Sequence, residues 1–270
     1  TANGAKGVVA NVPYITNLAN FTTVPFNALD PSNPALAPQI DALNTQLYGP
    51  LKNIFTAYGE PNRINVLSKT AANPVLIFDE NATDMSAQIT GALTPVLGAP
   101  TASAFGAIFG KARQATGNDL LLLASSTVIA TPVAGVPSPI NVNGVSYPLQ
   151  DQWVLTPQEQ SAIKTATDAY NTTIAAIAAS NPNVALVDFK GVLAEASTGI
   201  KFDAYTLNTK LVTGGLISLD GVHLTARGYA LMANKILAAM DAEFGTNFTT
   251  ATRGLAKAGD YPTNYSPALR

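Results

Sequence analysis

The chain contains one histidine, His223, which lies within residues 218–225 (SLDGVHLT). Histidine is the side chain that titrates near neutral pH without special tuning, so His223 is the candidate general base. Asp220 stands three residues earlier, in a turn that contains Gly221, and its carboxylate can fold back onto the ring. Such a contact would keep one ring nitrogen protonated and leave the other free to take a proton from a nucleophile. The spacing therefore favours an acid–base pair for nucleophilic catalysis.

The serines of the sequence do not stand in a pattern that identifies the partner of His223. Ser125 and Ser126 follow the apolar residues 120–124, at the end of an expected strand, where α/β enzymes place reactive groups. No glycine flanks them to form the sharp turn that exposes a nucleophile. Ser218 is close to His223 in sequence and could form a hydrogen bond within the turn. We interpret all three hydroxyls as partners of backbone groups at strand ends and turns.

The motif Asp-x-x-His-Leu-Thr at residues 220–225, followed by residues 226–229 (ARGY), resembles the last conserved block of a hydrolase family. This is the family of SGNH hydrolases, also called GDSL-type lipases or acylhydrolases. The resemblance implies that Asp220 is the orienting acid and His223 the general base of a triad. In that family a serine near the N-terminus completes the triad and attacks an ester. An ester substrate and no cofactor are therefore expected.

Three further segments carry the same resemblance. Residues 6–13 (KGVVANVP) and 21–27 (FTTVPFN) resemble the region that follows the family's central Asn block. Residues 153–160 (WVLTPQEQ) resemble the start of a late helix in large, secreted bacterial members. The similarity thus extends over residues 6–248.

The family's earlier blocks are absent from the 270 residues. These are the Gly-Asp/Asn-Ser-Leu block of the nucleophile, the oxyanion Gly block and the Gly-x-Asn-Asp block. Residues 117–119 (GND) are a tempting substitute for the last, but their spacing is wrong, because Thr116 stands where the glycine should be. We interpret them as a loop that leads into a strand.

We therefore expect the sequence to be the C-terminal part of an SGNH hydrolase that is inactive alone. It starts at Thr1 without an initiator methionine or a leader sequence, which indicates a cut rather than a biological start. The nucleophile would lie in an N-terminal part, either a separate associated polypeptide or a further segment of a longer sequence. A self-contained domain that folds without that part is the alternative.

Composition narrows the possible cofactors and partners. Zinc sites need three or four ligands, with thiolate or imidazole among them, and the chain has no cysteine and one histidine, so no metal is expected. The net charge of −2 and the lack of a basic cluster make nucleic acid a poor candidate partner. No apolar run approaches the length of a membrane span. Only 12% of the residues are charged, which, with the resemblance, favours a secreted or cell-surface bacterial protein.

The order of predicted elements indicates an α/β fold. Short apolar β runs occur at residues 7–12, 75–78, 120–123 and 184–187. Helical patterns cover residues 40–58, 156–180 and 226–244, the second opening with a capping box at Thr156 and Glu159 and the third capped by Thr225 and ended by Gly245. Asp188, directly after the last β run, is interpreted as the cap of the next turn rather than a catalytic group.

Other segments are less regular. Residues 85–109 predict a short helix plus a loop, and residues 131–149, with Asn143 and Gly144, predict a small hairpin. The apolar stripe of the helix at 156–180 continues to about residue 180 and consists of Ile163, Ala166, Ala169, Tyr170, Ile174 and Ile177.

The resemblance implies a three-layer, flavodoxin-like parallel sheet, of which this chain would supply only the later strands and helices. We expect residues 1–29 and 151–248 to form the C-terminal part of the hydrolase core. Residues 30–150 are expected to form an insertion or cap, and residues 249–270 a tail.

Two other functions remain open at this point. One is a catalytically inactive module that binds surface glycans and keeps the hydrolase scaffold. The other is a structural subunit of a larger surface assembly, which the middle of the chain, rich in alanine, threonine and proline, would suit.

Overall fold

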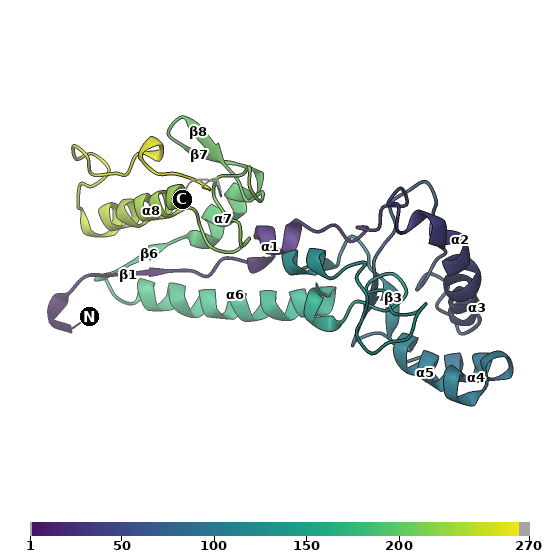
Figure 1. The fold of residues 1–270 in the computed structure, drawn as a ribbon. Helices are drawn as coiled ribbons and strands as arrows, with labels where there is room; N and C mark the ends of the chain where they lie inside the picture. Colours follow the sequence, from purple (N-terminus) through teal and green to yellow (C-terminus); the bar gives the residue numbers. More distant parts are fainter. Residues whose placement is uncertain (1, 265–270) are drawn as a thin grey trace. The chain divides into compact units, whose positions relative to one another are not determined.

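Figure 1 shows the computed structural model, which describes residues 2–264. The chain divides into two compact units, each with its own hydrophobic core. The terminal unit consists of residues 1–23 and 160–270, and the middle unit consists of residues 24–159. Helices alternate with short parallel and antiparallel sheets, so the α/β class is confirmed. Residues 265–270, the end of the expected tail, lie outside the described residues.

The terminal unit is built on a parallel pair of strands. Strand β1 (Gly7–Ala10) pairs with β6 (Val184–Val187) in a register that places Gly7 opposite Val184 and Ala10 opposite Val187. Helix α8 (Ala226–Phe244) packs against β6, and in Figure 1 the two strands run between α8 and α6 (Pro157–Ala179). Strand β1 is preceded by η1 (Ala2–Gly4) and followed by η2 (Ile15–Asn17) and α1 (Ala19–Thr22).

The predicted capping box starts α6, whose bounds match the sequence pattern. The Thr156 backbone N–H and hydroxyl each donate to Glu159 Oε2 at 2.7 Å. The apolar stripe of this helix is not covered throughout, because Tyr170 and Ile177 are 61% and 53% exposed. Helix periodicity predicts which residues share a face, but not whether another element covers it.

After β6 the chain forms α7 (Phe189–Thr198) and the antiparallel hairpin of β7 (Ile200–Phe202) and β8 (Tyr205–Leu207). Asp188 caps α7, since its Oδ1 accepts from the Gly191 N–H at 2.9 Å and from Asn11 Nδ2 at 2.6 Å. The structural interpretation of Asp188 is therefore confirmed. The short helix η7 (Ala258–Asp260) follows α8 and returns along it.

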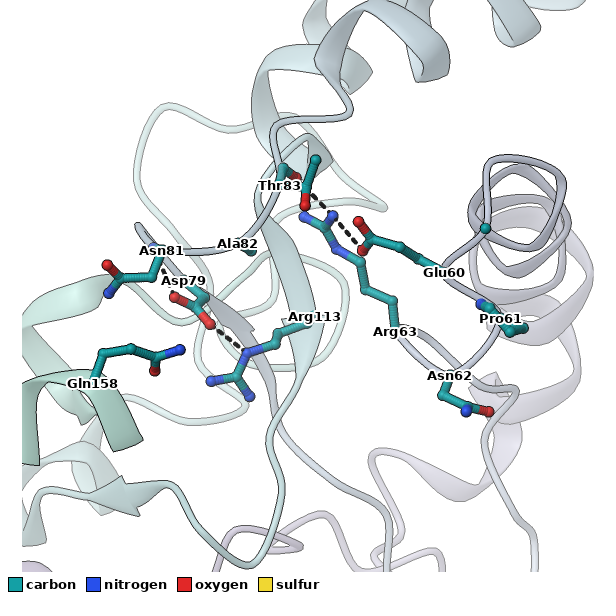
Figure 2. Close-up of a pocket in the computed structure, with 11 residues that line it drawn as sticks. Glu60, Pro61, Asn62, Arg63, Asp79, Asn81, Ala82, Thr83, Arg113 and Gln158 are labelled. Atoms are coloured by element: carbon teal, nitrogen blue, oxygen red, sulfur yellow. Dashed lines mark hydrogen bonds and ion pairs between the residues drawn. The ribbon is translucent and has the colours of Figure 1, made fainter. Parts of the chain in front are cut away.

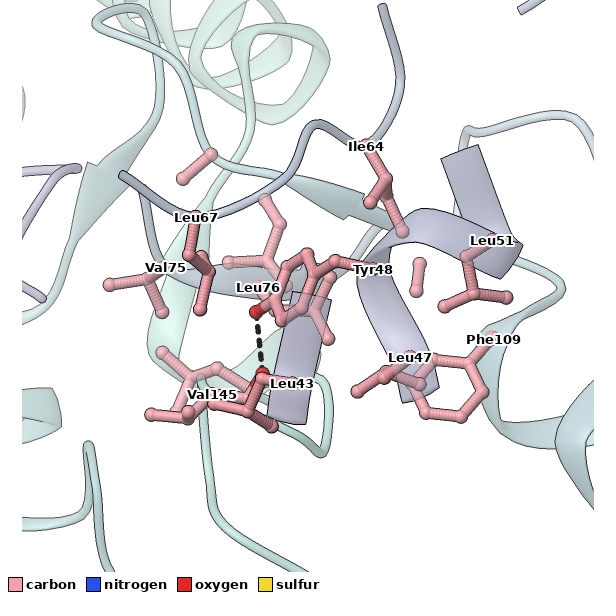
Figure 3. Close-up of a cluster of buried hydrophobic side chains, with 14 of the residues drawn as sticks. Leu43, Leu47, Tyr48, Leu51, Ile64, Leu67, Val75, Leu76, Phe109 and Val145 are labelled. Atoms are coloured by element: carbon pink, nitrogen blue, oxygen red, sulfur yellow. Dashed lines mark hydrogen bonds between the residues drawn. The ribbon is translucent and has the colours of Figure 1, made fainter. Parts of the chain in front are cut away.

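A nearly continuous helical stretch organises the core of the middle unit. It consists of η3 (Ala37–Gln39), α2 (Ile40–Leu43), the π-turn η4 (Asn44–Tyr48) and α3 (Gly49–Ala57). The π-turn places Tyr48 inside the core, where its hydroxyl donates to the Val145 carbonyl at 2.5 Å (Figure 3). Burial raises the pKa of the Tyr48 phenol, which therefore stays a neutral donor.

The strands of the middle unit form two antiparallel pairs. Strand β2 (Leu76–Phe78) pairs with β3 (Ala112–Gln114), and β4 (Leu120–Leu121) pairs with β5 (Val154–Leu155). The 3-10 helices η5 (Leu123–Thr127) and η6 (Asp151–Trp153) lie beside the second pair in sequence.

Two sequence predictions for the middle unit are wrong. Residues 85–109 form two helices, α4 (Ser86–Leu97) and α5 (Ala99–Phe109), joined at Gly98, whose φ of +76° suits glycine. They pack closely through Gly106, where a Cβ would lie 2.5 Å from the Ser86 carbonyl oxygen. The contact between the two helices is made by small residues and not by a stripe of large apolar side chains, so the sequence pattern did not indicate two helices.

The predicted hairpin is the second error. Within the described residues, 131–149 form no regular ladder but only isolated bridges, Pro132 with Val142 and Asn143 with Tyr147. Gly144 is not the tip of a hairpin, because its carbonyl accepts from the Leu76 N–H of β2 at 2.8 Å.

None of the helices within residues 2–264 combines the length and the apolar character that crossing a bilayer requires.

Candidate active site

A short loop at the start of α8 holds Asp220 and His223. Ile217 and Leu224 form an antiparallel bridge at its base, and the Ser218 N–H donates to the His223 carbonyl at 2.7 Å. The Gly221 N–H donates back to the Ser218 carbonyl at 3.0 Å, and the φ of Gly221 is +77°. A side chain at that position would be strained, so glycine permits the sharp turn between the acid and the imidazole.

The structure brings the two predicted residues together. His223 Nδ1 lies 2.6 Å from Asp220 Oδ2. An ionised carboxylate can only accept hydrogen bonds, so Nδ1 carries the hydrogen and Nε2 of the neutral ring holds a free lone pair. This is the ring orientation that a general base needs.

Asp220 is held in place by the backbone of its own loop. Its Oδ1 accepts from the Ser218 hydroxyl at 2.7 Å and from the Val222 and His223 N–H groups at 2.9 Å each. The hydrogen bonds from Ser218, from Val222 N–H and from the His223 ring hold the pKa of Asp220 well below its usual range. Asp220 therefore stays ionised as the partner of His223.

The pair is open to solvent. The side chains of His223 and Asp220 are 71% and 49% exposed. Within residues 2–264, Nε2 of His223 forms no hydrogen bond to another residue. The arrangement is thus able to accept a proton from a hydroxyl group that approaches the exposed edge of the ring.

Buried contacts fix the loop to the scaffold of the terminal unit. Thr225 caps α8, with its hydroxyl accepting from the Gly228 N–H at 3.0 Å and donating to the Gly215 carbonyl at 2.7 Å. On the other side, the Asn20 N–H of α1 donates to the Gly221 carbonyl at 2.9 Å. The exposed pair therefore stands on a loop that is anchored to the scaffold on both sides.

None of the serines named from the sequence forms a hydrogen bond to the imidazole within residues 2–264. Ser218 donates its hydroxyl hydrogen to Asp220, and Ser126 donates to the Leu123 carbonyl at 2.7 Å. Ser125 belongs to the middle unit and is fully buried. The expected hydrogen bond of Ser218 within the turn is therefore present, and its acceptor is the carboxylate of Asp220. Of the three hydroxyls, only that of Ser126 has the expected backbone partner, because the buried Ser125 hydroxyl forms no hydrogen bond within residues 2–264.

Residues 117–119 (GND) also have a structural role. Asp119 accepts from Arg113 Nη2 at 2.6 Å and from the Thr116 N–H at 2.7 Å, and its side chain is fully buried. Burial alone would raise the pKa of Asp119, but the bonds from Arg113 and Thr116 lower it.

Within residues 2–264 there is no group of three or more histidine, cysteine, aspartate or glutamate side chains that could hold a metal ion.

The first turn of α8 offers a test of how tightly the loop is held. A Cβ at Gly228 would lie 2.5 Å from the Leu216 carbonyl oxygen, whereas a Cβ at Gly259 would meet nothing within 4 Å. We predict that Gly228→Ala lowers the free energy of unfolding by about 1–2 kcal/mol, because the clash outweighs the helix propensity of alanine. Urea unfolding of both variants measures this, and Gly259→Ala should stay within about 0.5 kcal/mol of the parent. Equal midpoints for the two variants would contradict the close approach.

Comparison with known protein families identifies one whose model matches this chain. Residues 103–236, about half of the chain, match the family model described as GDSL-like Lipase/Acylhydrolase. No curated protein and no solved structure matches the chain. The matched region contains Asp220, His223 and the first part of α8. The chain therefore belongs, through residues 103–236, to the GDSL-like lipase and acylhydrolase family.

Proposed function

We propose that the protein is a serine-type carboxylic ester hydrolase in which His223 is the general base and Asp220 orients it. The observation that carries this proposal is the 2.6 Å contact between Asp220 Oδ2 and His223 Nδ1, with Nε2 exposed and unpaired within the described residues. Family membership supports an esterase or acylhydrolase, and therefore an ester as substrate.

The proposed reaction has two acyl-transfer steps. His223 Nε2 takes the proton of a serine hydroxyl as the serine oxygen attacks the ester carbonyl carbon. The imidazolium that forms is stabilised by Asp220, and it returns the proton to the leaving alcohol as the carbon–oxygen bond breaks. Water then attacks the acyl-serine with the same assistance, which releases the carboxylic acid and regenerates the serine. Backbone N–H groups and asparagine donors would hold the oxyanion in both steps.

We further propose that the attacking serine lies on a polypeptide segment outside the 270 residues. Ser218 is engaged by Asp220, and Ser125 is buried in the middle unit. No other serine in residues 2–264 is hydrogen-bonded to the imidazole.

The surface of the terminal unit is suited to receive such a segment. Among the described residues, β6 is the one strand that pairs with β1, so the other edge of β1 is open. Large apolar side chains nearby in this unit are exposed, namely Val8, Leu186, Tyr170 and Ile177. An open strand edge and exposed apolar side chains are both unfavourable in water. A further strand would pair with the edge of β1, and other parts of the same segment would cover apolar side chains. This would extend the sheet towards the three-layer arrangement that the resemblance implies.

Residues 30–150, which make up most of the middle unit, would then be an insertion in the hydrolase core. The low content of charged residues is in keeping with a secreted or cell-surface location.

Replacing the pair should remove hydrolysis from the complete protein. We predict that His223→Ala lowers kcat/KM for a short-chain p-nitrophenyl ester by roughly 10⁴- to 10⁶-fold, because no other group can accept the serine proton. Asp220→Asn should cost about 10⁴-fold, because the amide no longer holds the correct tautomer. Asp260→Asn, an exposed aspartate in the same unit, is the matched control and should keep full activity. Activity retained in His223→Ala would refute the assignment.

The source of the nucleophile can be tested by covalent labelling. Treatment of the complete protein with a fluorophosphonate probe, followed by peptide mass spectrometry, should place the label on a serine outside residues 1–270. The label should be lost in His223→Ala, because the hydroxyl is then no longer activated. Labelling of Ser218 or of any other serine in the 270 residues would contradict this part of the proposal. Absence of both labelling and hydrolysis would favour an inactive binding or structural module.

A further inference from the structure

The middle unit contains a polar cleft of about 480 Å³. Four segments line it: residues 59–63 after α3, Asp79 and residues 81–83 after β2, Arg113 of β3 and Gln158 in the first turn of α6 (Figure 2). All of them belong to residues 24–159. The volume lies within the range of small-molecule sites, roughly 300–1,000 Å³.

Two arginines fix the loops that form the cleft. Arg63 is almost fully buried, and it donates to the carbonyls of Thr83, Gly110 and Ala112 at 2.7–2.8 Å and to Glu60 Oε2 at 2.8 Å. These bonds join the loop after α3 to the loop after β2 and to the segment before β3. The cleft is therefore preorganised, which reduces the entropic cost of binding.

Arg113 ties the other side of the cleft together. Its Nε donates to Asp79 Oδ2 at 2.6 Å, and its Nη2 donates to Asp119 Oδ1 at 2.6 Å. Asp79 Oδ1 also accepts from the Asn81 N–H at 2.8 Å. Asp79, whose side chain is 5% exposed, thus contributes a fixed carboxylate to the wall of the cleft, and each of its oxygens retains a lone pair for a further donor.

The charges and side chains of the cleft exclude two classes of ligand. Both guanidinium groups are already paired with carboxylates, Arg63 with Glu60 and Arg113 with Asp79 and Asp119. A free anion would therefore meet no unpaired positive charge. The lining has no large apolar side chain, which makes it unsuitable for an acyl chain or an aromatic group.

The cleft also contains neutral hydrogen-bonding side chains. The side-chain amides of Asn62, Asn81 and Gln158 form no hydrogen bond to other residues within 2–264. Figure 2 shows the Gln158 side chain extending toward Asp79 and Arg113. Each amide offers two donor hydrogens and an acceptor oxygen. Vicinal hydroxyl groups of a sugar both donate and accept, so they match a cleft in which amides stand beside a fixed carboxylate.

We propose that this cleft binds a neutral saccharide through its vicinal hydroxyl groups. Asp79 would accept from sugar hydroxyls, while Asn81 and Gln158 would both donate to and accept from them. The cleft belongs to the middle unit, whereas Asp220 and His223 belong to the terminal unit. Saccharide binding therefore does not depend on ester hydrolysis, and either property can be lost without the other.

The test is native affinity electrophoresis of the whole chain in gels that contain one soluble polysaccharide each. Neutral xylan, galactomannan, mixed-linkage β-glucan and dextran are the probes, with polygalacturonate as the anionic comparison. We expect retardation by at least one neutral polysaccharide. Asn81→Ala combined with Gln158→Ala should weaken that binding by about tenfold or more, because two hydrogen-bonding side chains are lost while the arginine network stays intact.

The matched control is Asn53→Ala combined with Gln46→Ala, which removes two exposed amides of the same unit outside the cleft. This control should bind as the parent does, and both double variants should unfold at the same urea concentration as the parent. Retardation by no neutral polysaccharide, or by polygalacturonate alone, would overturn the proposal. Equal affinity of the cleft variant and the parent would overturn it as well.

Discussion

The candidate active site depends on one carboxylate that accepts four hydrogen bonds. Asp220 receives the Ser218 hydroxyl and the N–H groups of Val222 and His223 on one oxygen, and the His223 ring on the other. The three bonds to Oδ1 fix the carboxylate, and the fourth bond then fixes the ring. Because the same loop supplies all four donors, the geometry of the pair needs little help from distant parts of the chain.

A well-bonded carboxylate alone does not identify a site, as Asp241 shows. Asp241 accepts from the hydroxyls of Thr246 and Thr249 and from the N–H groups of Phe248 and Thr249. Burial would raise the pKa of Asp241, but these bonds lower it, as in Asp220. Asp241 has no imidazole beside it and serves to hold the chain after α8. The feature that sets Asp220 apart is therefore the basic ring that it orients.

The sequence predicts best what is encoded locally. The contact of Asp220 with His223, the cap at Thr225 and the bounds of α8 all follow from residues a few positions apart. Packing between distant segments was not predictable in the same way. The pairing of α4 with α5 relies on close approach at Gly106, and the exposure of Tyr170 depends on what covers α6. The saccharide cleft has the same origin, since Arg63, Asp79 and Arg113 come from three separate segments and no motif links them.

The most direct measurement of the central claim is the tautomer of the lone imidazole. Selective ¹⁵N labelling of histidine gives a single set of ring signals in this chain, so no assignment by mutation is needed. At a pH where the ring is neutral, long-range ¹H–¹⁵N correlation should show hydrogen on Nδ1 and an unprotonated, basic Nε2. Hydrogen on Nε2 instead would mean that Asp220 does not orient the ring as a base, and it would contradict the account.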